Sequence, residues 1–204
     1  MSRISLLLWD VGGVLLSNAW DRDARAAAAG RFGLDRTEFE RRHALVEENF
    51  ETGRMDWEGY LDATVFYVPR RFSREEFRQF MRAQSTANHD AIALARSLRE
   101  QRSYVMATLN NESRELNDYR IHAFGLRDLF DGFFSSGYTG RRKPAPEAYR
   151  LALDVTQRTP EESLLLDDRR ENIEAAARLG LHTLMVQDTG RLREELARMG
   201  VRSG

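Results

Sequence analysis

The chain has 204 residues, of which 42% are hydrophobic and 31% charged, so it can build a sizeable core and is not a wholly disordered protein. Its 31 Lys and Arg residues balance 32 Asp and Glu residues, and a formal net charge of -1 creates no overall field toward nucleic acid or anionic membranes. No cysteine is present, which excludes disulfides, thiolate metal sites and cysteine nucleophiles.

The length predicts one domain with a modest insertion. The first apolar run, Ile4 to Trp9, is far shorter than the ~20 residues that cross a bilayer. It also lacks the small-residue cleavage site of a secretory signal. We therefore expect a cytoplasmic protein whose partners include neither nucleic acid nor membrane, and the oligomeric state stays open.

The first predicted element is a buried strand over residues 4–9. Its apolar residues are continuous, which is typical of a strand covered on both faces of a sheet. Asp10-Val11-Gly12-Gly13 follows as a glycine-rich turn, so Asp10 is expected at the carboxyl end of this strand.

A helical block is predicted next, from about Asp21 to Gln84. Charged and alanine-rich sequence there carries apolar residues at helical spacing, for example Phe39, His43, Val46 and Phe50. Residues 63–68 are ambiguous between helix and strand. No strand of convincing length interrupts the block.

Strands and helices alternate through the rest of the chain. Strands are predicted over 103–109, 132–135, 164–166 and 181–186, and helices over 91–100, 112–124, 146–155 and 170–179. This alternation predicts an α/β fold with a doubly wound parallel sheet. The sheet domain comprises residues 1–16 and 87–204, and residues 17–86 form a helical insertion.

Three predicted strands end in polar residues: Asp10, Asn110-Asn111 and Asp167-Asp168. Open parallel sheets bind ligands at the carboxyl ends of their strands, where these side chains would meet. Each one alone also fits an ordinary turn or cap residue. A carboxylate beside a buried strand is costly unless a metal ion or a partner compensates its charge.

Four ordered segments together resemble the motifs of the haloacid dehalogenase-like (HAD) hydrolase superfamily. They are Asp10-Val11-Gly12-Gly13-Val14-Leu15, Leu109-Asn110-Asn111, Arg142-Lys143-Pro144 and Leu166-Asp167-Asp168-Arg169-Arg170-Glu171-Asn172. The resemblance implies a Rossmann-like core, a small helical cap at 17–86, an aspartyl nucleophile and Mg2+ dependence in the phosphatase branches.

The same resemblance implies roles for single residues. Asp10 is the expected nucleophile, and Lys143 is expected to balance charge on the phosphate and the carboxylate. Asp10, Asp168 and the main-chain carbonyl of Gly12 would hold Mg2+, with Asp167 beside them; carboxylate oxygens suit that ion. The expected substrate contacts are Gly12, Asn110 (where the family usually has Ser or Thr), Asn111 and the cap residues Glu51 and Arg54.

Gly12 departs from the family pattern. Phosphatases of the family usually carry an aspartate two residues after the nucleophile, which protonates the leaving oxygen and then activates water. Glycine cannot transfer a proton, and such help is worth about 10²- to 10⁴-fold. We therefore expect a slow phosphatase, a small phosphorylated metabolite with a good leaving group such as a glycosyl 1-phosphate or acyl phosphate, or a proton donor recruited from the cap.

Two alternatives stay open. Metal-free 2-haloacid dehalogenases also lack an aspartate at this position, because a halide leaves without a proton. The doubled Asp167-Asp168 and the absence of a tyrosine two residues after Asp10 argue against that reaction. The chain could instead be a non-catalytic regulator that binds phosphate or metal.

Overall fold

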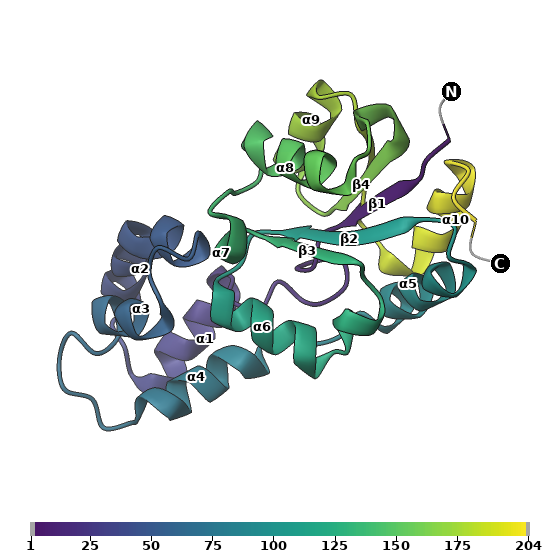
Figure 1. The fold of residues 1–204 in the computed structure, drawn as a ribbon. Helices are drawn as coiled ribbons and strands as arrows, with labels where there is room; N and C mark the ends of the chain where they lie inside the picture. Colours follow the sequence, from purple (N-terminus) through teal and green to yellow (C-terminus); the bar gives the residue numbers. More distant parts are fainter. Residues whose placement is uncertain (1–2, 203–204) are drawn as a thin grey trace.

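The computed structural model describes residues 3–202, and its centre is a parallel sheet of five strands (Figure 1). The strands are β1 (Leu6–Trp9), β2 (Val105–Asn110), β3 (Gly132–Ser135), β4 (Ser163–Asp167) and β5 (His182–Met185), in the spatial order β3-β2-β1-β4-β5. β1 therefore lies in the middle, with Leu6 paired to Val105 on one side and to Ser163 on the other. The predicted α/β parallel-sheet class is confirmed.

Helices cover both faces of this sheet, and β1 shows why its sequence is apolar throughout. Leu7 and Trp9 belong to the core cluster under α5 (His89–Gln101) and α10 (Leu192–Arg198). Leu6 and Leu8 belong to the cluster under α8 (Pro146–Thr156) and α9 (Arg170–Arg178). Alternate side chains of a strand point to opposite faces, so a strand covered on both faces needs apolar residues at every position.

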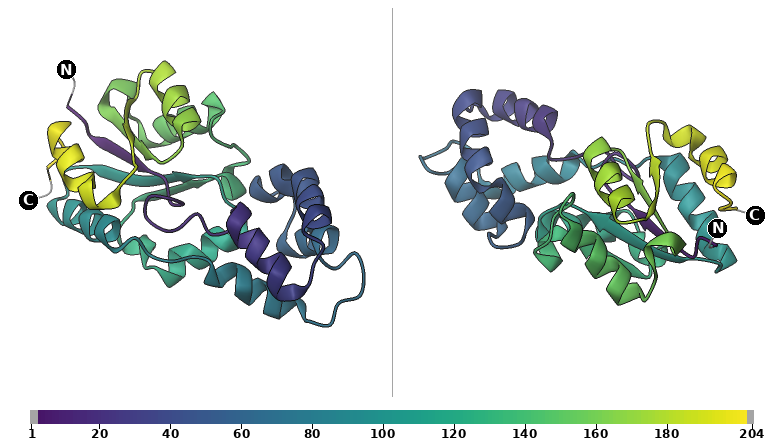
Figure 2. Two further views of the ribbon diagram at one scale, coloured as in Figure 1. Left: turned by 180° about the vertical axis from the view of Figure 1, so that it is seen from behind. Right: turned by 90° about the horizontal axis from the view of Figure 1, so that it is seen from above.

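The helical insertion contains α1 (Arg22–Phe32), α2 (Arg36–Glu51), α3 (Trp57–Thr64) and α4 (Arg74–Ala83). Each begins at a capping residue whose side chain accepts backbone N–H bonds: Asp21, Asp35, Asp56 and Ser73. These helices share their own aromatic-rich core, and α6 (Arg114–Ala123) adds Leu116 to it. Figure 2 shows the group standing at one end of the sheet, away from α10.

Two chain segments join the cap to the sheet domain, and they run side by side. Leu16 bridges Ala87, and Ser17 N donates to Thr86 O over 2.9 Å. Asn88 N donates to Leu15 O over 3.0 Å. These contacts lie at the residues where the sequence predicts the division between core and cap.

The strand boundaries differ from the predicted ones at positions that matter for the site. β2 extends to Asn110 and β4 to Asp167, so both polar residues are the last of their strands and not the first of a loop. The ambiguous residues 63–68 are the end of α3 and a turn. The short helix α7 (Ser136–Thr139) after β3 was not foreseen. Within residues 3–202 no helix has the length and apolar character needed to cross a bilayer.

Candidate active site

Three carboxylates meet at the carboxyl ends of the neighbouring strands β1 and β4. Asp10, Asp167 and Asp168 each offer an oxygen, and these atoms lie within 4.8 Å of one another. The sheet register causes this meeting, because Trp9 pairs with Leu166 and Asp10 N donates to Leu166 O over 2.8 Å. The acidic residues that follow the two strands therefore arrive at the same edge.

Lys143 lies between two of these carboxylates. Its Nζ is 2.6 Å from Asp167 Oδ2 and 3.1 Å from Asp10 Oδ1, and the side chain is buried. It is also the only lysine in a sequence with 30 arginines. An ammonium is a compact point charge, whereas a guanidinium is a broad planar fork, so this slot selects lysine.

The burial and the charges of this group shift the pKa values of Lys143 and Asp10. Burial alone would lower the pKa of Lys143, but the facing carboxylates of Asp10 and Asp167 raise it above its usual value. Burial raises the pKa of Asp10 to about 7, although Lys143 opposes the shift. One ammonium thus contacts two of the three clustered carboxylates, so the group as a whole carries more carboxylates than cations.

The carboxylates differ in how their oxygens are used. Both oxygens of Asp167 accept from Asn172 Nδ2 at 3.0 Å, and Oδ1 also accepts from Arg169 N at 2.8 Å. Asp168 Oδ1 is buried and has no hydrogen-bond partner among residues 3–202. Asp167 is thus held within the protein, while Asp168 keeps an unused oxygen.

The residues present fit a divalent cation. Mg2+ prefers hard oxygen ligands, and an unpaired buried carboxylate oxygen beside excess negative charge is what such an ion would compensate. Gly13 brings its backbone close to Asp168: it has a φ of 74°, and a Cβ there would collide with the Asp168 carboxylate. Only glycine fits both constraints.

Asn18 fills the space beside Gly12. A Cβ on Gly12 would lie 3.0 Å from Asn18 Oδ1, and Asn18 Nδ2 donates to Asp168 Oδ2 over 3.3 Å. The place beside Gly12 is therefore occupied by an amide, which does not transfer protons at neutral pH.

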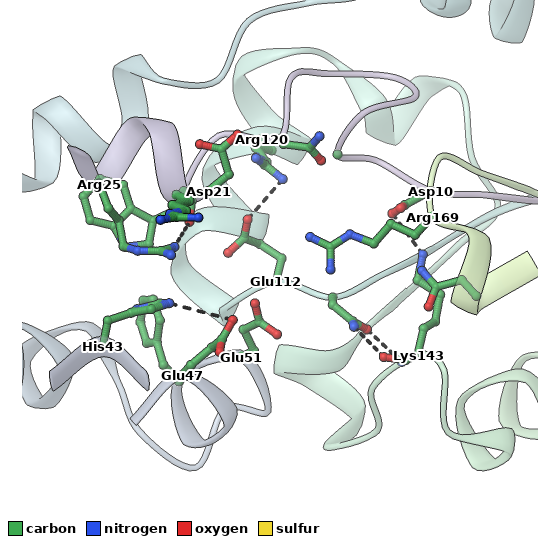
Figure 3. A pocket seen from close by; sticks show the side chains of 17 residues that line it. Asp10, Asp21, Arg25, His43, Glu47, Glu51, Glu112, Arg120, Lys143 and Arg169 are labelled. Atoms are coloured by element: carbon green, nitrogen blue, oxygen red, sulfur yellow. Dashed lines mark hydrogen bonds and ion pairs between the residues drawn. The ribbon is translucent and has the colours of Figure 1, made fainter. Parts of the chain in front are cut away.

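A cavity of about 240 Å³ lies between this edge of the sheet and the cap (Figure 3). Charged and polar side chains dominate its wall, and both domains contribute. The lining residues are Asp10, Gly12, Asn18, Trp20, Asp21, Arg22, Arg25, His43, Glu47, Phe50, Glu51, Asn111, Glu112, Arg120, Lys143, Arg169 and Asn172.

Two predicted substrate contacts lie outside this lining. Asn110 points into the protein, where its Nδ2 donates to Asn117 Oδ1 over 3.1 Å. Arg54 is turned to Glu48, with 2.5 Å between Arg54 Nη2 and Glu48 Oε1. Both side chains are committed to protein partners, so neither faces the space that a substrate would fill.

Asn111 does line the cavity, but its amide holds the lysine loop. Its Nδ2 donates to Lys143 O over 2.8 Å, and its Oδ1 accepts from Lys143 N over 2.9 Å. This pair of hydrogen bonds ties the end of β2 to the segment that carries the lysine. The side chain therefore positions Lys143.

The cap closes on the core beside the lysine. Ser136 Oγ donates to Glu51 O over 2.6 Å, and Arg142 Nη2 lies 2.7 Å from Glu51 Oε2. Gly53 approaches the carbonyl of Gly137 so closely that a Cβ on Gly53 would collide with it. The end of α2 is thus held against the wall of the active site.

Several cavity residues gave no separate signal in the sequence. Glu112 and Arg120 form a buried ion pair of 3.1 Å, and Glu47 faces His43 across 3.7 Å. In the sequence, charged residues on helices are typical of solvated faces. A buried charge pair is visible only once the helices are packed.

Comparisons with known proteins identify the family of this chain. A family model described as haloacid dehalogenase-like hydrolase matches residues 4–180. The chain is 30% identical over 136 residues to bifunctional epoxide hydrolase 2 of Rattus norvegicus, covering 65% of this chain but only 24% of the rat protein. It is 24% identical over 214 residues to flavin mononucleotide hydrolase 1 of Arabidopsis thaliana, covering 98% of this chain and 79% of that protein.

Solved structures share the fold. A HAD family enzyme of Bacteroides thetaiotaomicron in complex with magnesium superposes with a TM-score of 0.81 at 20% identity, covering 97% of this chain and all of that one (100%). A dehalogenase superposes with a TM-score of 0.65 at 17% identity, covering 92% of this chain and 86% of that one.

Proposed function

This chain belongs to the haloacid dehalogenase-like hydrolases, and from that premise we propose that it is a Mg2+-dependent phosphatase of small phosphorylated metabolites with Asp10 as its nucleophile. The observation that carries the proposal is the buried Lys143 beside Asp10, next to an Asp168 oxygen without a partner. A nucleophile and a fixed positive charge thus line one cavity, and the place for a cation lies beside them.

Asp10 and Asp168, with the main-chain carbonyl of Gly12 and with Asp167 beside them, would hold the ion. Bound Mg2+ supplies positive charge that lets an anionic carboxylate approach an anionic phosphate. In support, a HAD family neighbour of similar fold is solved with magnesium and inorganic phosphate.

The reaction takes place in two displacements. Asp10 forms a bond to phosphorus while the bond to the leaving oxygen breaks, which produces an aspartyl phosphate. Water then attacks phosphorus, and the bond to Asp10 breaks to release inorganic phosphate. Lys143 stabilises the negative charge that gathers on the phosphoryl oxygens in both steps, because it is fixed in place before the substrate binds.

The cavity favours a small, polar leaving group. Its volume of about 240 Å³ is below the range of about 300–1,000 Å³ that is typical of sites for drug-sized ligands. The relatives include a flavin mononucleotide hydrolase and a sesquiterpene phosphatase, which act on larger molecules by their names. A glycosyl 1-phosphate or an acyl phosphate suits the polar wall of this site and leaves without much protonation.

Dehalogenation of 2-haloacids is the second candidate, because Gly12 has no side chain that could donate a proton and a halide leaves without one. The likeness to a solved dehalogenase concerns the fold alone. An unpaired oxygen of Asp168 favours the phosphatase, since a metal-free reaction has no use for it. A cytoplasmic location without nucleic-acid or membrane partners stays a prediction.

One assay separates the candidates. Purified protein is given p-nitrophenyl phosphate or acetyl phosphate with and without Mg2+, and 2-chloropropionate without metal. We expect phosphate release that needs Mg2+ and that is abolished by Asp10→Asn. The control Asp154→Asn makes the same change at an exposed position on α8 and should leave the rate unchanged. Metal-free chloride release would establish the dehalogenase instead, and no turnover of any substrate would favour the regulator.

A further inference from the structure

The active site lacks a proton donor where the leaving group departs. Gly12 has no side chain, and Asn18 fills the adjoining space. A displacement at phosphorus places the attacking and leaving oxygens roughly in line. Because Asp10 belongs to the core wall, the leaving oxygen points to the cap side of the cavity, and a donor from the cap could reach it.

Two carboxylates of the cavity wall are already used by the protein. Glu112 lies 3.1 Å from Arg120 and accepts from Ser113 N over 2.9 Å. Asp21 accepts the backbone N–H groups of the first turn of α1. Neither is free to hand a proton to a substrate.

A third carboxylate, Glu47, faces deeper into the cap. The His43 ring, whose Nε2 lies 3.7 Å from Glu47 Oε1, lowers the pKa of Glu47 to about 2, so this carboxyl carries no proton at neutral pH. The other ring nitrogen of His43 lies 2.9 Å from Tyr60 Oη. His43 therefore has cap residues at both nitrogens.

Unlike these three carboxylates, Glu51 lies where the cap meets the core, as the last residue of α2. Its backbone carbonyl is bound by Ser136, and its carboxyl lies beside Arg142, the residue before Lys143. The contact of Oε2 with Arg142 is an ion pair by distance, yet no hydrogen bond within the described residues uses this buried oxygen. In Figure 3 the carboxyl lies between Glu47 on the cap side and Lys143 on the core side.

The surroundings of Glu51 favour a carboxyl that holds a proton near neutral pH. Burial raises its pKa to about 7; Arg142 and Arg169 oppose the shift, and Glu112 and Glu47 add to it. Of these four charged groups, Glu47 lies on α2, Glu112 lies just before α6, Arg142 lies next to Lys143, and Arg169 follows β4. An acid poised near the working pH is the most effective proton donor.

We propose that Glu51 of the cap performs the proton transfer for which Gly12 has no group, an inference that rests on the proposed phosphatase function. In the first displacement the Glu51 carboxyl gives its proton to the leaving oxygen as the P–O bond breaks, so the product leaves as a neutral alcohol. In the second, the Glu51 carboxylate takes a proton from the attacking water. Glu51 is then protonated again, and phosphate is released.

The test compares leaving groups. Wild type, Glu51→Gln and the control Glu48→Gln are assayed with phenyl phosphate, whose leaving group needs a proton, and with 2,4-dinitrophenyl phosphate, whose leaving group does not. Glu48 is on the same helix, is exposed and lies outside the cavity lining. We expect Glu51→Gln to lose about 10²- to 10⁴-fold in kcat/KM on phenyl phosphate and less than about threefold in kcat/KM on the dinitrophenyl ester, because kcat/KM reports the first displacement and not the shared hydrolysis of the aspartyl phosphate.

The pH profile adds a second measurement. With phenyl phosphate, kcat/KM of the wild type should fall as pH rises through about 7, and this limb should be absent in Glu51→Gln. Equal losses on both esters would mean a structural role for Glu51 and would overturn the inference while leaving the phosphatase intact. A wild type that hydrolyses neither ester with Mg2+, while Asp10→Asn behaves the same, would overturn the proposed function and the inference with it.

Discussion

Lys143→Met tests how far this active site depends on one buried charge. The substitution keeps an unbranched side chain of similar length and removes the ammonium that lies 2.6 Å from Asp167 and 3.1 Å from Asp10. Both carboxylates then remain buried without their cation. Lys143→Arg is the matched variant, because it retains the charge but needs a wider slot.

The expected loss of stability is large. Removing one partner of a buried ion pair costs about 3–5 kcal/mol, because an uncompensated charge stays behind. For a domain of this size each kcal/mol shifts Tm by about 2–4 °C, which corresponds to a fall of roughly 6 to 20 °C. Mg2+ should recover part of this loss, since the ion replaces the missing positive charge.

The loss should also depend on pH in a defined direction. Lys143 lowers the pKa of Asp10, which burial raises to about 7, so removing the lysine raises this pKa further. An acid whose pKa is raised by folding destabilises the protein increasingly as pH rises from its ordinary pKa to the raised value, and the cost is constant above that. In the wild type this cost therefore levels off near pH 7, whereas in the variant it continues to grow. The stability of Lys143→Met should therefore be lowest, relative to the wild type, above pH 7 and closer to that of the wild type at pH 5.

Thermal denaturation in EDTA at pH 5 and at pH 8, repeated with Mg2+ at pH 8, measures these effects. The reasoning would be refuted by a Tm at pH 8 that is unchanged in Lys143→Met, or by a larger loss at pH 5 than at pH 8. Lys143→Arg should fall between wild type and the Met variant at pH 8.

Two further predictions concern other groups of the site. Gly13→Ala should abolish the rise in Tm that Mg2+ produces, because the added Cβ would collide with Asp168. Gly33→Ala is the control: Gly33 also has a positive φ, but open space surrounds it. This control should have a lower Tm and should keep its response to Mg2+. The pKa of Glu51 is raised from 4.5 to about 7, so the cost of burying its charge grows between these two pH values. Glu51→Gln should therefore match wild-type stability at about pH 4 and exceed it at pH 8 by up to about 3 kcal/mol in urea unfolding. A variant less stable than wild type at pH 8 would contradict the assigned burial cost.

Much of the fold was predictable from local sequence patterns. A strand covered on both faces must be apolar at every position, and a helix must repeat its apolar residues at its own period, so both kinds of element leave signals within a few residues. The polar residues that stop β1, β2 and β4 are local signals as well. Because parallel strands present their carboxyl ends at one edge, Asp10 and Asp168 could be expected to meet before any coordinates were known.

Other features were decided by tertiary structure alone. The Asn111 side chain hydrogen-bonds the backbone of Lys143, 32 residues away in sequence, and Glu112 forms an ion pair with Arg120 in the interior. Arg54, close to Glu51 in sequence, turns to Glu48 instead of the cavity. The partner of each of these side chains depends on which side of its helix or loop the other domain covers. The local sequence around a charged residue is the same whether that residue is buried at the site or exposed to solvent. The sequence by itself therefore determined the sheet and its acidic edge, whereas the packing of the cap against the core decided which charges face the substrate.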